Sequence, residues 1–141
     1  METYVYDRDI DLQDIGHLYL IIDPHVGSRW IKVGKTNNPD KRLYTYNAHL
    51  PEDRFSFEYL TEEIYNLSKC EEMLIEFIKN TKKYKSPTTR REWFMPVYHN
   101  KKTQHKHQSI ISHMRKLENQ FFYGGIDWQT QIFIAALLSL N

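Results

Sequence analysis

Basic side chains crowd one short stretch of the sequence, residues 29–43, which reads RWIKVGKTNNPDKRL. Lys32 interrupts an apolar run, Lys35 directly follows Gly34, and Arg42 comes after a turn of Asn and Pro. A guanidinium group forms paired hydrogen bonds with phosphate oxygens, and an ammonium group attracts them as a point charge. These residue types therefore indicate a site that binds phosphate groups.

A second concentration of positive charge lies between Lys79 and Lys106. Nine Lys or Arg residues stand there against a single acid, Glu92, although the whole chain carries a net charge of only +1. Such a local excess can form an anion-binding face, and a solvated loop and helix surface is the alternative. Over both basic regions, the predicted phosphate contacts are Gly34, Lys35, Thr36, Lys41, Lys82, Lys83, Lys85, Arg90 and Arg91.

Predicted strands carry the first half of this site. Residues 16–23 and 29–35 are apolar runs bounded by turn residues, and they are close enough in sequence to pair as an antiparallel hairpin. Alternating aromatic and polar residues predict a third strand over 54–63. The sequence therefore predicts a small three-stranded antiparallel sheet.

Two predicted helices bring further side chains to this sheet. Gly34 is expected to let the backbone turn toward a helix over 36–50, which has Asn38 as its N-cap and Pro39 in its first turn. The N-terminus of such a helix attracts anions. Apolar residues at helical spacing predict the other helix over 66–80.

The C-terminal part of the chain is expected to be helical. Residues 92–98 are a short apolar stretch that fits either a strand or a packing plug, and helical spacing predicts helices over 109–122 and 127–140. The expected fold class is α+β, with a three-stranded antiparallel sheet flanked by helices and a C-terminal helical extension. The expected segments are an acidic N-terminal segment at 1–14, a central domain at 15–98 and a basic, helical extension at 99–141.

Composition points to a globular intracellular protein. The chain has 141 residues, of which 40% are hydrophobic and 26% charged, a balance typical of a folded domain. Its single cysteine, Cys70, allows no internal disulfide and fits a reducing compartment, either cytoplasm or nucleus. The N-terminus has no secretory apolar run, and the stretch IFIAALLSL is too short for a membrane span. Secretion and a transmembrane segment are therefore not expected.

Four motifs follow one another along about residues 15–95: GHLYLI, KVGKTNNPDKR, CEEMLIEFI and EWF. Their order and spacing resemble the GIY-YIG nuclease superfamily. The resemblance is in particular to its small phage and viral branch, where the second motif commonly reads K-[IV]-G-x-T and an EWF group follows downstream. The resemblance implies a metal-dependent DNA endonuclease or nickase that hydrolyses phosphodiester bonds.

The resemblance also implies roles for individual residues. Tyr19 on the first strand would line the active site, and Lys32 occupies the position where the second motif usually has a tyrosine. Arg42 on the first helix would brace the phosphate. Glu71 on the next long helix would bind one divalent metal ion, Mg²⁺ or Mn²⁺, with Glu72 as the alternative ligand. The EWF group would close the domain.

Two features depart from the superfamily pattern. Lys32 replaces the usual tyrosine, so either Tyr19 or Lys32 would take the proton from water. Many members also carry an asparagine about a dozen or more residues after the glutamate, whereas Asn80 comes too early here. These departures keep a second function open.

That second function is a catalytically weak or inactive protein on the same fold, which binds nucleic acid or acts as a viral accessory protein. A third alternative is a protein–protein adaptor that uses the helices after residue 107. The expected partners are DNA and, through the C-terminal helices, a second copy of the chain, with no membrane partner. The preferred DNA structure and sequence stay open.

Overall fold

The protein folds around one antiparallel sheet, as seen in a computed structural model. Its strands are β1 (His17–Ile22), β2 (Ile31–Thr36), β3 (Phe57–Leu60), β4 (Tyr84–Lys85) and β5 (Trp93–Pro96), in the spatial order β3-β1-β2-β5-β4. The α+β class with an antiparallel sheet and helices is confirmed. The structure describes residues 10–25, 28–50, 55–86, 92–97, 107–126, 133 and 136–140.

The sheet has five strands, so the predicted number of three is wrong. The first three strands lie where the sequence predicts them. β5 extends the sheet from the edge of β2, where Phe94 lies opposite Ile31 and Trp93 opposite Lys32. β4 then pairs with β5, and its two residues are too few to produce an alternating pattern in the sequence.

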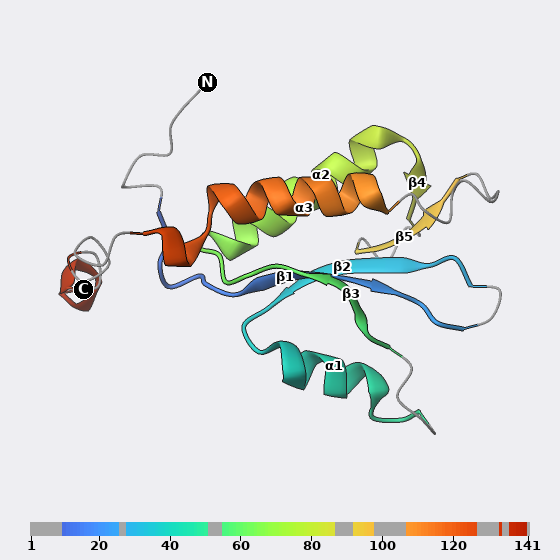
Figure 1. Cartoon of the computed structure of the whole chain (residues 1–141), viewed down its shortest axis with the longest axis horizontal. Coiled ribbons are helices and arrows are strands. Elements are labelled where there is room, and N and C mark those ends of the chain that lie inside the picture. Colours follow the sequence, from blue (N-terminus) through green and yellow to red (C-terminus); the bar gives the residue numbers. More distant parts are fainter. Residues whose placement is uncertain are drawn as a thin grey trace.

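Helices cover both faces of the sheet, as Figure 1 shows. Helix α1 (Pro39–Asn47) lies on one face, and α2 (Leu67–Thr81) and α3 (Gln108–Gln120) lie on the other. A short 3₁₀ turn, η3 (Tyr123–Gly125), follows α3. Side chains alternate between faces along a strand, so each residue of β1 and β2 is directed toward either α1 or the helix pair.

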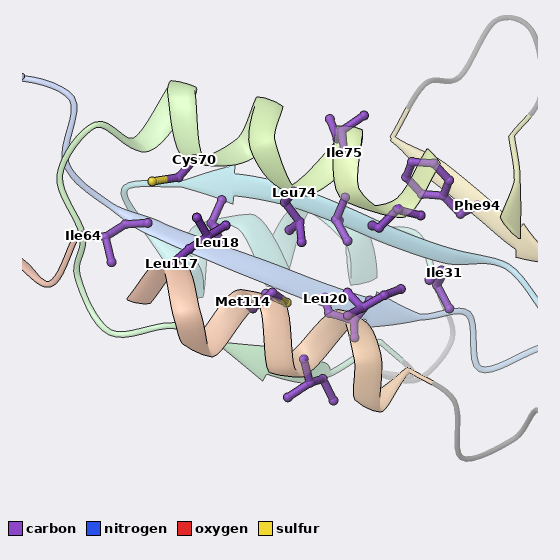
Figure 2. Packing of buried hydrophobic residues seen from close by; sticks show 14 of the residues in the cluster. Leu18, Leu20, Ile31, Ile64, Cys70, Leu74, Ile75, Phe94, Met114 and Leu117 are labelled. Carbon is purple, nitrogen blue, oxygen red and sulfur yellow. The ribbon is translucent and has the colours of Figure 1, made fainter. Parts of the chain in front are cut away.

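The hydrophobic core lies between the sheet and the helix pair (Figure 2). Leu18 and Leu20 of β1 face Leu74 of α2 and Met114 of α3, and all four are fully buried. Helix α3 therefore belongs to the same core as the predicted central domain, although the sequence suggested an extension. The predicted terminal helix at 127–140 falls mostly outside the described residues, and the boundary at residue 98 stays a prediction.

Helix α1 begins as the sequence predicts. Pro39 is its first residue, and the Asn38 side chain accepts a hydrogen bond of 3.1 Å from the Lys41 backbone N–H. This bond satisfies one of the N–H groups that a helix leaves without partners in its first turn. The prediction of Asn38 as the N-cap is confirmed.

We expect Asn38→Ala to lower the free energy of unfolding by about 1 kcal/mol, because the cap hydrogen bond is lost. The measurement is chemical denaturation followed by circular dichroism. Asn37→Ala is the matched control, because Asn37 is exposed beside the cap and accepts no bond from the described part of the helix. Equal losses in the two variants would contradict the cap assignment.

Candidate active site around strand β2

Tyr19 lies in the middle of β1, directly opposite Gly34 in β2. Its side chain is only 1% exposed and points to the α1 face of the sheet, where its hydroxyl shares a 3.1 Å hydrogen bond with the Tyr46 hydroxyl. A Cβ atom on Gly34 would come within 2.5 Å of the Tyr19 Cζ atom. Gly34 therefore makes room for the tyrosine ring inside the strand, and the expected turn at this glycine is wrong.

Tyr46 is a residue of this site that the sequence reasoning missed. It lies four residues after Arg42 on α1, and this spacing places the two side chains on one face of the helix. Burial is the main cause that raises the pKa of Tyr46, and burial together with the Tyr46 hydrogen bond raises the pKa of Tyr19. The charge of Arg42 acts against both shifts without cancelling them. Both tyrosines are therefore neutral hydroxyls at physiological pH.

Lys32 is enclosed by groups that attract a cation. Its Nζ atom lies 3.7 Å from Glu92 Oε2, 5.2 Å from the centre of the Tyr46 ring and 5.7 Å from the centre of the Trp93 ring. The Lys32 side chain is only 16% exposed. Ion pairing and cation–π attraction both act on an ammonium group. The surroundings of Lys32 thus suit a fixed positive charge on the α1 face.

Lys35 points to the other face of the same strand. It lies opposite Leu18 of the core, and its Nζ atom donates a 2.6 Å hydrogen bond to Ser68 Oγ in the first turn of α2. Lys32 and Lys35 therefore reach opposite sides of β2. The alternation of side chains along a strand would have predicted this separation.

Glu71 extends from the second turn of α2 and is partly buried. Burial, followed by the negative charge of Glu92, raises the pKa of the Glu71 carboxyl, while Lys35 and Lys32 act in the opposite direction. Within the described part of the chain, this carboxylate makes no hydrogen bond and no ion pair. The neighbouring Glu72 is exposed, so the helix presents Glu71 rather than Glu72 to the basic residues.

Glu92 connects the two sides of β2. Its carboxylate pairs with Lys32, and its charge acts on the Tyr46 hydroxyl and on Glu71. The backbone holds it beside β2, because the Val33 N–H donates a 3.2 Å hydrogen bond to the Glu92 carbonyl oxygen. The sequence reasoning gave the EWF group a closing role only, although Glu92 is the single acid of the basic segment.

The remaining predicted phosphate contacts are dispersed. Thr36 is buried at the end of β2, and its hydroxyl accepts a 3.0 Å hydrogen bond from the Asn38 N–H, so it stabilises the turn into α1. Lys41 is exposed on α1. Three further predicted phosphate contacts are exposed at the end of α2 and on β4, namely Lys82, Lys83 and Lys85. Arg90 and Arg91 lie outside the described residues.

Glu71 offers one carboxylate to a metal ion, a donor that would suit Mg²⁺ or Mn²⁺. No group of three or more His, Cys, Asp or Glu side chains gathers in the part of the chain that the structure describes. Mg²⁺ is commonly held by one or two carboxylates together with water and substrate phosphate oxygens. Within the described residues the Glu71 carboxylate has no hydrogen-bond or ion-pair partner, which would suit such an ion.

Residues 16–115 match the T5orf172 domain, which covers well over half of the 141 residues. The chain therefore belongs to the T5orf172 domain family. This domain occurs in phage proteins and is associated with GIY-YIG-like, nuclease-like folds. Neither the curated proteins nor the solved structures include a significant match to the chain. None of the described helices is both long and apolar enough to cross a membrane.

Proposed function

We propose that this protein is a metal-dependent DNA endonuclease or nickase with a GIY-YIG-type active site. The main support is that Tyr19 and Lys32 come from the paired strands β1 and β2, while Arg42 and Glu71 come from the helices on the two faces of the sheet (Figure 1). The charges of Lys32 and Arg42 act on Tyr19, and the charge of Lys32 also acts on Glu71. Family membership supports the same class of protein.

The proposed substrate is a phosphodiester, bound by cations on the α1 face. Arg42 is exposed and presents a planar donor pair to the phosphate, while Lys32 supplies a fixed charge beside it. These cations stabilise the negative charge that develops on the phosphoryl oxygens during attack. Tyr46 orients the Tyr19 hydroxyl through their shared hydrogen bond.

Glu71 is the residue that would hold the divalent ion, Mg²⁺ or Mn²⁺. When bound, such an ion polarises the phosphoryl group and neutralises the leaving oxygen. The exposed residues Lys82, Lys83 and Lys85 would contact the DNA backbone without reading its sequence. Binding that weakens steeply with salt would follow from these contacts.

Arg42→Ala is expected to slow cleavage of supercoiled plasmid by about 100-fold, because one preorganised phosphate donor is lost. The measurement is a single-turnover nicking assay with Mg²⁺ or Mn²⁺, with DNA affinity followed in parallel. Lys41→Ala is the matched control, because it removes an exposed positive charge from the adjacent position. We expect Lys41→Ala to reduce affinity slightly and to leave the rate of the bound complex unchanged.

A catalytically inactive DNA-binding protein is the second candidate. Asn80 favours it, because this residue is exposed near the end of α2, about 14 Å along the helix from Glu71 at 1.5 Å per residue. It therefore does not replace the asparagine that many GIY-YIG enzymes have near the substrate. Wild-type protein that binds DNA but leaves plasmid intact with both metals would favour this candidate and overturn the nuclease.

The proposed homodimer would form through the C-terminal segment that follows α3. Helix α3 places Ile110, Met114 and Leu117 in the core of its own chain, which leaves those side chains unable to bind a second copy. A dimer contact would instead use the segment 127–140, where the described residues Phe133 and Leu140 are exposed.

A further inference from the structure

The proposed cleavage reaction assigns no role to Trp93, although this residue lies directly opposite Lys32 where β5 pairs with β2. Two residues in such a cross-strand pair extend their side chains from the same face of the sheet. The Lys32 Nζ atom accordingly lies 5.7 Å from the centre of the Trp93 ring, within the range of a cation–π interaction. Trp93 therefore contacts the ammonium group from the neighbouring strand.

A second ring reaches the same ammonium group from helix α1. The Lys32 Nζ atom lies 5.2 Å from the centre of the Tyr46 ring, and the Tyr46 hydroxyl shares a hydrogen bond with Tyr19 on β1. The Lys32 side chain is only 16% exposed, so protein encloses most of it. Because cation–π attraction strengthens as water is excluded, both rings can restrain this lysine effectively.

We propose that Trp93 is a positioning residue of the nuclease site, which together with Tyr46 holds the ammonium group of Lys32 where it binds the substrate phosphate. This role rests on the proposed function. Lysine carries its charge on a flexible four-carbon stem, so an unrestrained ammonium group would occupy many positions. Contacts from a strand and from a helix reduce these positions before the substrate binds, and such preorganisation favours stabilisation of the charge that develops on the phosphoryl oxygens.

Aromatic faces restrain an ammonium group without taking its charge away from the phosphate. A ring face attracts the cation through its quadrupole, and the three N–H donors of the ammonium group remain able to bind phosphate oxygens. A carboxylate would instead compete with the phosphate for the same charge. Glu92 is such a group, but its Oε2 atom lies 3.7 Å from Lys32 Nζ and its side chain is 42% exposed, so water and salt weaken the ion pair.

The first experiment compares wild type, Trp93→Leu and Trp93→Phe in single-turnover cleavage of supercoiled plasmid with Mg²⁺ or Mn²⁺. We expect Trp93→Leu to cleave about 10-fold more slowly because one cation–π contact is lost, and Trp93→Phe to stay within about threefold of wild type because a ring face remains. Trp30→Leu is the matched control, since Trp30 is a partly buried tryptophan that is not one of the two rings at Lys32. It should cleave like wild type. Unfolding temperatures show that each variant is folded during the assay.

A double variant tests whether Trp93 acts through Lys32. Lys32→Met removes the ammonium group and keeps a flexible unbranched side chain. Trp93→Leu should then cause no further slowing in the Lys32→Met background, because residues in contact have coupled effects. An equal slowing by Trp93→Leu in both backgrounds would overturn the proposal, since Trp93 would then act without Lys32. Equal slowing by Trp93→Leu and Trp93→Phe would overturn it as well.

A second readout does not depend on cleavage. Acetic anhydride reacts with the unprotonated form of an amine, so an ammonium group that ring faces stabilise is acetylated slowly. Acetylation of Lys32, followed by mass spectrometry, should be at least about threefold faster in Trp93→Leu than in wild type and unchanged in Trp30→Leu. The exposed Lys41 is the internal reference and should react equally in all three proteins. Unchanged acetylation of Lys32 in Trp93→Leu would overturn the proposed contact.

The two proposals fail in different ways. If wild type cleaves plasmid and Trp93→Leu cleaves at the same rate, the role of Trp93 is wrong and the nuclease stands. If wild type binds DNA without cleaving it under both metals, the nuclease is wrong and the role of Trp93 in cleavage falls with it.

Discussion

Glu71→Gln should lower the rate of plasmid cleavage by about 1,000-fold, because a metal ion supplies several kcal/mol of transition-state stabilisation and each 1.4 kcal/mol is tenfold in rate. The neutral amide is a weaker ligand for a divalent ion than the carboxylate. DNA affinity measured without metal should not fall, since the substitution removes a negative charge. The measurement is single-turnover cleavage with Mg²⁺ and Mn²⁺.

The same substitution should not weaken the fold. Burial and the charge of Glu92 raise the pKa of Glu71, so the folded protein holds this proton more tightly than the unfolded chain does. The ionised carboxylate therefore opposes folding at pH values above the pKa that Glu71 has in the unfolded chain. This cost in free energy is absent at pH values below that pKa. Glu71→Gln should consequently unfold at a temperature equal to or above that of wild type at pH 7. Lost cleavage without a lower unfolding temperature would mean that Glu71 acts in the reaction and not in holding the fold.

Glu72→Gln is the matched control for this experiment. The two glutamates are adjacent on α2, but Glu72 is exposed and Glu71 is partly buried. We expect Glu72→Gln to keep wild-type cleavage. The reverse result, with Glu72→Gln inactive and Glu71→Gln active, would assign the metal ion to Glu72 and contradict the site described here.

The sequence predicts those parts of the fold that local chemistry determines. Asn38 and Pro39 define the start of α1 because capping requires only a side-chain oxygen and a fixed backbone angle at adjacent positions. The apolar periodicity of α2 likewise depends on its own residues. In contrast, β4 forms only because β5 lies beside it, and two residues carry no period of their own. Tertiary pairing therefore sets the number of strands.

The candidate site divides in a similar way. Resemblance to a family directs attention to Tyr19, Arg42 and Glu71, because the motifs that contain them follow one another in the order and spacing of that family. Glu92 reaches its position only when β5 pairs with β2, and no local sequence pattern predicts this pairing. Tyr46 was detectable from its spacing to Arg42, although its hydrogen bond to Tyr19 requires the packing of α1 on the sheet.

Gly34→Ala is expected to lower the free energy of unfolding by about 2 to 3 kcal/mol, the upper part of the range for an overpacked core. The added methyl group would lie 2.5 Å from the Tyr19 Cζ atom, and the Tyr19 side chain is 1% exposed, so the ring has little room to move away. Displacement of this ring would also break its hydrogen bond to Tyr46. Cleavage should therefore fall together with stability. Chemical denaturation and the plasmid assay measure the two effects.

Gly125→Ala is the matched control, because a Cβ there meets nothing closer than 3.4 Å and should change stability little. A double variant then tests the cause. Tyr19→Leu removes the ring atoms that the new methyl group would strike, so Gly34→Ala should cost clearly less in the Tyr19→Leu background than in wild type. Contacting residues commonly show such coupling, at about 0.5 to 3 kcal/mol. Additive losses would mean that Gly34 is needed for the strand backbone itself and not for the space it gives to Tyr19.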